Sequence, residues 1–220
     1  MSEDKSKDKI LKVKLPMDYP PEEGCYLRGN DFSPAAVVVL LNNPREQTPL
    51  EIEQLVRVAI ENGAALAGTV QTENIGIEKI VSNIVANPNI RYLIICGIEV
   101  AGHNTGDALK CLIENGINDR RIIVGSKAIT PYLFNIPIES IKRFRRQLTL
   151  INLLNEVAPD VVAKAVWSCY QEEPTAFQNY MLHDPGACPE AAICSKITLR
   201  IKKPQEIEDW EIDDILKGGE

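Results

Sequence analysis

The feature that most constrains the fold is a regular alternation of short apolar runs with segments of helical periodicity. Residues 35–41 (AAVVVLL) and 92–96 (YLIIC) are continuous apolar runs rich in β-branched side chains. Runs of this length and composition predict strands buried on both faces. Residues 64–70 (AALAGTV) predict a weaker third strand, and residues 121–124 (RIIV) predict a short fourth one.

Apolar residues at three- and four-residue spacing predict a helix after each strand. These helices are expected at residues 48–63, 77–85, 105–115 and 137–151, and a further one at 161–169. In the first, Thr48 is the expected N-cap and Pro49 the first helical residue. In the fourth, Ile141, Phe144, Leu148 and Ile151 form the apolar face, and a solvated face carries Lys142, Arg143, Arg145 and Arg146.

The strand–helix order favours an α/β fold with an open parallel sheet and helices on both faces. Right-handed crossovers place the carboxyl ends of all parallel strands at one edge, where ligands bind in such sheets. We expect three parts: a polar N-terminal arm (1–23), a main domain (24–160), and a C-terminal part (161–220). The C-terminal part would hold a helix, a small β appendage suggested by the alternating Ile197, Leu199 and Ile201, and an acidic tail.

Composition excludes several classes of protein. The 220 residues are 45% hydrophobic and 25% charged, as in ordinary globular proteins, and the net charge of −7 argues against a nucleic-acid partner. No stretch approaches the roughly 18 apolar residues that span a bilayer, and the charged N-terminus lacks the apolar segment of a secretory signal. We therefore expect a cytoplasmic protein without a direct membrane span. Its six cysteines are expected to be reduced, with Cys96 and Cys111 in the core.

The turn at residues 97–106 holds one of only two histidines, His103, between a predicted strand and a predicted helix. The spacing of Gly97, Gly102 and Gly106 does not match a dinucleotide fingerprint, and there is no Walker motif. A general anion site at the helix N-terminus remains open. So does the common alternative, in which a lone histidine at a helix start only caps or packs.

A metal site is the third interpretation of His103. No cysteine or carboxylate is spaced to complete a tetrahedral set with it. One histidine suffices, however, if the metal brings its own equatorial ligands, as in haem or a corrin, and flanking glycines would leave room for a flat macrocycle. The second ring nitrogen then needs a partner that fixes its tautomer, and Asp107 and Glu99 are the candidates.

Residues 72–117 (TENIGIEKIVSNIVANPNIRYLIICGIEVAGHNTGDALKCLIENGI) resemble the MtrA family, the corrinoid-carrying A subunits of tetrahydromethanopterin S-methyltransferase. The similarity extends through residues 24–41 and 120–148 and covers roughly residues 24–155. Its most specific elements are TEN-G-EK, NPNIR and G-H-x-T-G. The resemblance implies a Rossmann-like fold that holds a cobamide (cobalamin or 5-hydroxybenzimidazolylcobamide), with His103 as the lower axial ligand of cobalt.

The resemblance also implies a function. In the family, a methyl group moves from a pterin carrier to cobalt and then to the thiol of coenzyme M, with other methyltransferase subunits as partners and with coupling to sodium transport in a membrane complex. The family usually ends in a membrane helix, which this sequence does not show, so we expect a soluble homologue. The D-x-H-x-x-G pattern of other cobalamin-binding methyltransferases is half met, because Ala101 stands at the aspartate position.

Further cofactor contacts are expected at the same edge of the sheet. The candidates are Gly97, Glu99, Gly102, His103, Thr105, Gly106 and Asp107 in one turn, Thr69, Gln71, Thr72, Glu73 and Asn74 in another, and Thr130, Pro131 and Tyr132 after the fourth strand. The second group could bond corrin amides or the nucleotide tail. Thr72 or Asn74 could equally cap a helix.

Two alternatives stay open. Cys169, His183, Cys188 and Cys194 could form a structural zinc site, which would fit a non-catalytic binding or scaffold module. The chain could also retain the fold but bind free corrinoid for transport or sensing.

Overall fold

A five-stranded sheet forms the centre of the computed structural model, which describes residues 12–42 and 48–169. The strand order is β1-β3-β2-β4-β5. β2 (Ala35–Leu40) pairs in parallel with β3 (Leu66–Val70) and β4 (Tyr92–Gly97), and β4 pairs in parallel with β5 (Thr149–Leu154). Only the three-residue edge strand β1 (Tyr26–Arg28) is antiparallel. The expected Rossmann-like open parallel sheet is confirmed, with β1 as an antiparallel addition at its edge.

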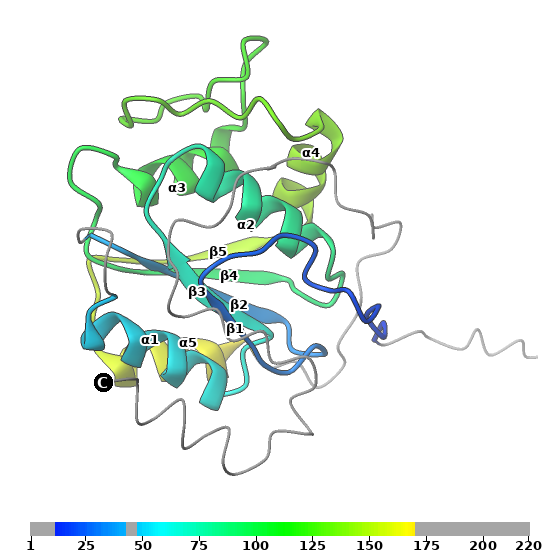
Figure 1. Cartoon of the computed structure of the whole chain (residues 1–220), viewed down its shortest axis with the longest axis vertical. Coiled ribbons are helices and arrows are strands. Elements are labelled where there is room, and N and C mark those ends of the chain that lie inside the picture. The colour runs from blue at the N-terminus through cyan, green and yellow to red at the C-terminus, as the bar shows by residue number, and fades with distance from the viewer. Residues whose placement is uncertain (1–11, 43–47, 170–220) are drawn as a thin grey trace, which may run out of the picture.

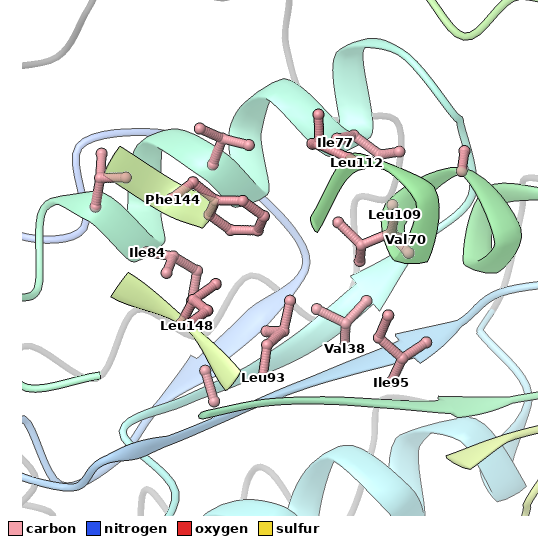
Figure 2. Close-up of a cluster of buried hydrophobic side chains, with 14 of the residues drawn as sticks. Val38, Val70, Ile77, Ile84, Leu93, Ile95, Leu109, Leu112, Phe144 and Leu148 are labelled. Carbon is pink, nitrogen blue, oxygen red and sulfur yellow. The ribbon is translucent and has the colours of Figure 1, made fainter. Parts of the chain in front are cut away.

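Helices cover both faces of this sheet (Figure 1). α1 (Leu50–Glu61) and α5 (Pro159–Ser168) pack on one face. α2 (Ile75–Val85), α3 (Thr105–Asn115) and α4 (Ile138–Gln147) pack on the other. β2 is buried at all six positions and divides its side chains between the two layers. Val38 points toward α2 and α3, where Ile77, Ile84, Leu109 and Phe144 close the larger core (Figure 2), and Val37 and Val39 face α1 and α5.

The predicted fourth strand is wrong in position. Residues 121–124 form only isolated bridges, Ile117 with Ile123 and Ile122 with Tyr132, within a long connection between α3 and α4. The fourth parallel strand is β5, which begins inside the predicted helix 137–151. That helix ends at Gln147, and the apolar run from Thr149 to Leu154 pairs with β4. The helical spacing of Ile141, Phe144 and Leu148 continues to Ile151 only by coincidence, because a short apolar run satisfies either period.

The start of α1 also differs from the prediction. The N-cap is Pro49, not Thr48, and none of the side chains that the structure describes caps the helix. The Pro49 carbonyl accepts the N–H groups of Ile52 and Glu53 at 3.0 and 3.1 Å. The helix therefore begins one residue later than the usual placement of proline suggests.

The expected solvated face of α4 is only partly solvated. Arg143 is buried and its Nε donates to Gln147 Oε1 at 3.0 Å. Arg145 donates to the carbonyls of Ile113 and Glu114 at 3.1 and 2.9 Å, which satisfies the end of α3. Lys142 is exposed and pairs with Glu139.

Both ends of the described chain contribute buried residues to this domain. Leu15 and Tyr19, from the expected N-terminal arm, are buried. The predicted helix at 161–169 corresponds to α5, whereas the expected β appendage, the acidic tail, and His183, Cys188 and Cys194 lie outside the described residues. Across 12–42 and 48–169, no helix has the length and apolarity needed to cross a membrane.

Candidate functional site

Two turns at the carboxyl ends of β3 and β4, the strands on either side of β2, build the site. Residues 71–74 join β3 to α2, and residues 98–104 join β4 to α3. The Thr105 hydroxyl donates to the Gln71 carbonyl at 2.7 Å and ties the second turn to the first. His103 and Glu73, thirty residues apart in sequence, meet across this junction.

The central contact is between His103 Nδ1 and Glu73 Oε2, at 2.7 Å. Only 1% of the Glu73 side chain is exposed, against 47% for His103. The other carboxylate oxygen of Glu73 accepts two hydrogen bonds from Thr130, one from its backbone N–H at 3.0 Å and one from its hydroxyl at 2.7 Å. The imidazole is thus held at one nitrogen by a buried group that is itself fixed.

The charge of Glu73 bears on which ring nitrogen of His103 carries a proton. Burial raises the pKa of Glu73, but the hydrogen bonds from its own backbone, Thr130 and His103 outweigh this effect, so the pKa lies below its ordinary value. Glu73 is therefore ionised near pH 7 and accepts the proton on Nδ1 of His103. In the neutral imidazole, this hydrogen bond selects the tautomer whose lone pair is on Nε2, and the His103 side chain as a whole is 47% exposed.

The prediction that Asp107 or Glu99 contacts the ring of His103 is wrong. Glu99 accepts the N–H groups of Val100 and Gly106 on one oxygen, at 2.8 and 2.9 Å, and that of Asp107 on the other, at 2.8 Å. Asp107 instead accepts the N–H of Lys127 at 2.8 Å. Glu99 therefore holds the backbone of its own turn and the start of α3, and Asp107 holds the backbone of the α3–α4 connection. Since Glu99 already occupies the N–H groups at the start of α3, it also removes the anion site considered there.

The glycines of this turn have different roles. Gly97 has φ +91°, and a Cβ there would lie 2.9 Å from the backbone nitrogen of Leu40. A Cβ on Gly106 would lie 2.6 Å from Leu154 Cδ1 and 2.8 Å from Leu40 Cδ1, so glycine permits α3 to begin against the sheet. Gly102 has φ +81°, and no atom of residues 12–42 or 48–169 lies within 4 Å of an added Cβ.

The β3–α2 turn is held mainly by helix capping. Asn74 Oδ1 accepts the N–H of Ile75 at 2.7 Å, and the Thr72 hydroxyl accepts that of Gly76 at 3.0 Å. The capping interpretation is therefore confirmed for both residues. Asn74 also donates to the Thr130 hydroxyl at 3.3 Å. The buried hydroxyl of Thr69 has no hydrogen-bond partner in the described part of the chain.

The α3–α4 connection brings Thr130 to the site, and it does so without following a strand of the sheet. The expectation that Thr130, Pro131 and Tyr132 follow a fourth strand is therefore wrong. Thr130 binds Glu73 directly. The Pro131 carbonyl accepts the N–H of Ile123, and the Tyr132 ring stacks on Phe134 with 5.3 Å between centroids. These interactions lie within the α3–α4 connection and do not involve His103.

A second buried carboxylate holds the same connection, and sequence reasoning does not identify it. Glu78 accepts the backbone N–H of Asn135 at 2.9 Å and its side-chain amide at 2.8 Å. Arg121 donates to the carbonyls of Leu133, Phe134 and Ile136 and closes the loop on itself. The sequence signal for Glu78 is a charged residue beside Ile77 on the apolar face of a helix.

Within residues 12–42 and 48–169 no three side chains among histidine, cysteine, aspartate and glutamate gather as a metal-binding group. Cys169, the described member of the considered zinc site, is buried and its thiol donates to the Ala165 carbonyl at 3.3 Å. The other described cysteines, Cys25, Cys96 and Cys111, are buried free thiols.

Comparison with known proteins assigns the family. The family profile of the A subunit of tetrahydromethanopterin S-methyltransferase, MtrA, matches residues 12–184. The second A-type subunit of this methyltransferase from Methanothermobacter thermautotrophicus is 36% identical over 189 residues, which cover 86% of this chain and 91% of the relative. The first A-type subunit from the same organism is 40% identical over 172 residues, covering 77% and 68%. The Methanopyrus kandleri A subunit is 39% identical over 163 residues, covering 73% and 63%. The chain therefore belongs to the MtrA family, the A subunits of tetrahydromethanopterin S-methyltransferase.

Proposed function

We propose that this chain is a corrinoid carrier in methyl transfer, in which His103 is the lower axial ligand of the cobalt in a cobamide such as cobalamin or 5-hydroxybenzimidazolylcobamide. The observation that carries the proposal is the 2.7 Å contact of Glu73 with Nδ1 of a half-exposed histidine. A carboxylate on one ring nitrogen is the arrangement that orients a metal-ligating imidazole and makes it a better donor at the other nitrogen.

The residues around His103 fit a broad, flat group. Ala101 and Gly102 are exposed and nearly without side chains, and Ile98 adds an apolar surface that is 47% exposed. No described carboxylate or thiol joins His103 as a second ligand, so the site suits a metal that brings its own equatorial ligands. His103 would hold the metal. Thr130, which binds Glu73, and Asn74, which donates to Thr130, are polar side chains beside it that could bind the amides of the ring.

When bound, the cobamide supplies a cobalt centre that can take a methyl group from a pterin-type donor and give it to a thiol such as coenzyme M. Glu73 accepts the hydrogen bond from Nδ1–H, so Nε2 is the nitrogen that would hold the metal. Thr130 keeps Glu73 ionised and immobile. Gly102, with its unobstructed left-handed backbone, lets the segment carrying His103 approach or retreat during turnover.

Substrates and partners follow from the family. The relatives are named for tetrahydromethanopterin and for S-methyl transfer, which supports a pterin donor and a thiol acceptor. The two other carboxylates of the His103 turn, Glu99 and Asp107, bind backbone N–H groups and are not available to a substrate. We therefore infer that other methyltransferase subunits supply the two transfer sites.

Reconstitution tests this proposal. The purified protein is incubated with hydroxocobalamin, desalted, and its absorption spectrum compared with those of His103→Ala and His183→Ala, which removes the only other histidine. Retained corrin bands that change only in His103→Ala are expected. Absence of corrin from the wild-type protein, or identical spectra for all three, would contradict the proposal, and zinc analysis would then test the scaffold alternative.

A further inference from the structure

Two side chains from the start of α3 hold the backbone of Lys127, which lies in the connection between α3 and α4 (residues 116–137; Figure 1). The Lys127 N–H donates to Asp107 Oδ2 at 2.8 Å, and the Lys127 carbonyl accepts a hydrogen bond from Asn104 Nδ2 at 3.3 Å. We call these two contacts the Lys127 clamp. Both clamping side chains lie close in sequence to His103, which directly precedes Asn104.

The clamp completes a closed cycle of contacts that passes through the candidate site. Thr130 follows Lys127 in the same connection, and its backbone N–H and hydroxyl both donate to Glu73 Oε1. The other carboxylate oxygen of Glu73 contacts Nδ1 of His103, and His103 is joined to Asn104 by a peptide bond. The histidine is therefore held from two sides, by Glu73 at its ring and by the clamp at the backbone that follows it.

Asn104 stands at the N-cap of α3 but does not cap it. Its side chain makes no capping hydrogen bond within the described residues, because Glu99 already accepts the N–H groups of Gly106 and Asp107. The Asn104 backbone is left-handed, with φ 47° and ψ 46°, a conformation that asparagine tolerates better than most residues. Asparagine at this position therefore supplies a backbone conformation and an amide for Lys127, and not the usual cap.

The backbone is fixed on the far side of His103 and less constrained on the near side. The N–H groups of His103 and Asn104 both donate to the carbonyl of the buried Val100, at 3.1 and 2.8 Å, and the Asn104 carbonyl accepts the N–H of Ala108 at 2.9 Å. Gly102, on the near side, has φ +81° and no side chain. A movement of the imidazole would therefore hinge at Gly102 and leave the clamp in place.

We propose that Asn104 and Asp107 are positioning residues for His103. By clamping Lys127 they keep Thr130 on Glu73, and Glu73 stays in place to accept the hydrogen bond from Nδ1. The inference rests on the proposed function for its consequence, since a fixed tautomer is needed where Nε2 is to hold a metal. The contacts themselves belong to the protein without cofactor and are measurable there.

Three variants separate positioning from a general effect on stability. Asn104→Gly combined with Asp107→Ala opens the clamp, and glycine keeps the left-handed backbone. Asp107→Asn is the conservative variant, because it removes the charge from the first turn of α3 but keeps an oxygen that can accept the Lys127 N–H. Asn115→Ala is the matched control, since the Asn115 amide ties the same connection to the other end of α3, through the Val124 carbonyl at 2.9 Å.

The first measurement is the imidazole ¹⁵N NMR spectrum of His103 in protein without cofactor, at a pH where the ring is neutral. His183→Ala in every sample removes the signals of the only other histidine. Wild type, Asp107→Asn and Asn115→Ala should each show one tautomer, with the proton on Nδ1. The clamp-opening double variant should show a mixture, because the free histidine side chain favours the proton on Nε2. Lower stability alone leaves the tautomer of the folded protein unchanged.

The second measurement is the equilibrium affinity for hydroxocobalamin. The double variant should bind about tenfold more weakly than wild type, as is usual when the partners that orient a metal-ligating histidine are disturbed. Asp107→Asn and Asn115→Ala should bind as wild type does. An altered tautomer with unchanged affinity in the double variant would overturn the positioning role.

Other outcomes are equally decisive. The wild-type tautomer in the double variant, a mixture of tautomers in wild type, or the same change in Asn115→Ala would overturn the inference. Asp107→Ala alone provides the comparison if the double variant does not fold. A clamp-dependent tautomer in a protein that binds no corrinoid would contradict the proposed function only. A His103-dependent corrin spectrum with a tautomer that ignores the clamp would contradict this inference only.

Discussion

Oε2 of Glu73 lies 2.7 Å from Nδ1 of His103. The carboxylate is almost fully buried and the imidazole is half-exposed. Glu73 is in addition the acceptor for two donors of Thr130, so three segments distant in sequence meet at one carboxylate. This arrangement makes Glu73 both a structural anchor and the acceptor for the proton on Nδ1 of His103.

Removal of the anchor should destabilise the protein. In Glu73→Ala, the backbone N–H and hydroxyl of Thr130 lose their acceptor, so we expect the free energy of unfolding to fall by about 2–3 kcal/mol. Urea denaturation measures this change. Glu114→Ala, at an exposed position, should change stability by less than about 0.5 kcal/mol. Equal losses in the two variants would show that Glu73 is not an anchor.

The pH dependence of stability should reveal the same residue. The folded-state pKa of Glu73 lies below its ordinary value of 4.5, so its contribution is complete above that value. The contribution declines as the pH falls from 4.5 toward the folded-state pKa and is lost below it. Glu73→Gln should therefore lose less stability than wild type as the pH is lowered through this window. Parallel stability curves for the two proteins, measured by urea denaturation, would contradict the assigned shift.

Close packing of Gly106 predicts a third outcome. In Gly106→Ala, the new methyl group would meet Leu154 and Leu40 at 2.6 and 2.8 Å, so a loss of about 1–3 kcal/mol is expected from overpacking. Gly102→Ala should lose about 1 kcal/mol, because only its positive φ is unfavourable for alanine. Thermal and urea denaturation compare the two. A smaller loss in Gly106→Ala than in Gly102→Ala would be inconsistent with the packing described.

The basic residues of α4 should differ in how much each contributes to the free energy of unfolding. Arg145→Ala removes two hydrogen bonds from the carbonyls at the end of α3, and we expect a loss of about 1–2 kcal/mol. Lys142→Ala removes only an exposed ion pair and should change stability by less than about 0.5 kcal/mol. The matched pair is compared by urea denaturation, and equal effects would argue for the fully solvated face that the sequence pattern indicates.

Local pattern predicted much of the fold, because strands β2, β3 and β4 are short apolar runs and helices α2 and α3 show a clear helical period. It failed where a short run was compatible with two periods, as at β5, whose residues Thr149–Leu154 extend the apolar spacing of α4. β1 was missed because three residues carry no period.

The site was predictable only in part. His103 stood out by its glycine-flanked turn, and the set of polar residues near it included Glu73 and Thr130. Which carboxylate contacts the imidazole depends on how the β3–α2 and β4–α3 turns meet at the carboxyl edge of the sheet, whereas sequence proximity favours Glu99 and Asp107. Both are held by backbone N–H groups, a role that only the three-dimensional path of the chain reveals.

The most direct test of the central claim is electron paramagnetic resonance of the protein loaded with cobalamin and reduced to cobalt(II). The nitrogen nucleus of the lower axial ligand splits each cobalt line, into three for ¹⁴N and two for ¹⁵N. Protein labelled with ¹⁵N-histidine and loaded with unlabelled cobalamin should show doublets, and His103→Ala prepared in the same way should not. Triplets in the labelled wild-type protein would mean that the cobamide's own base remains on cobalt, and that His103 is not the ligand.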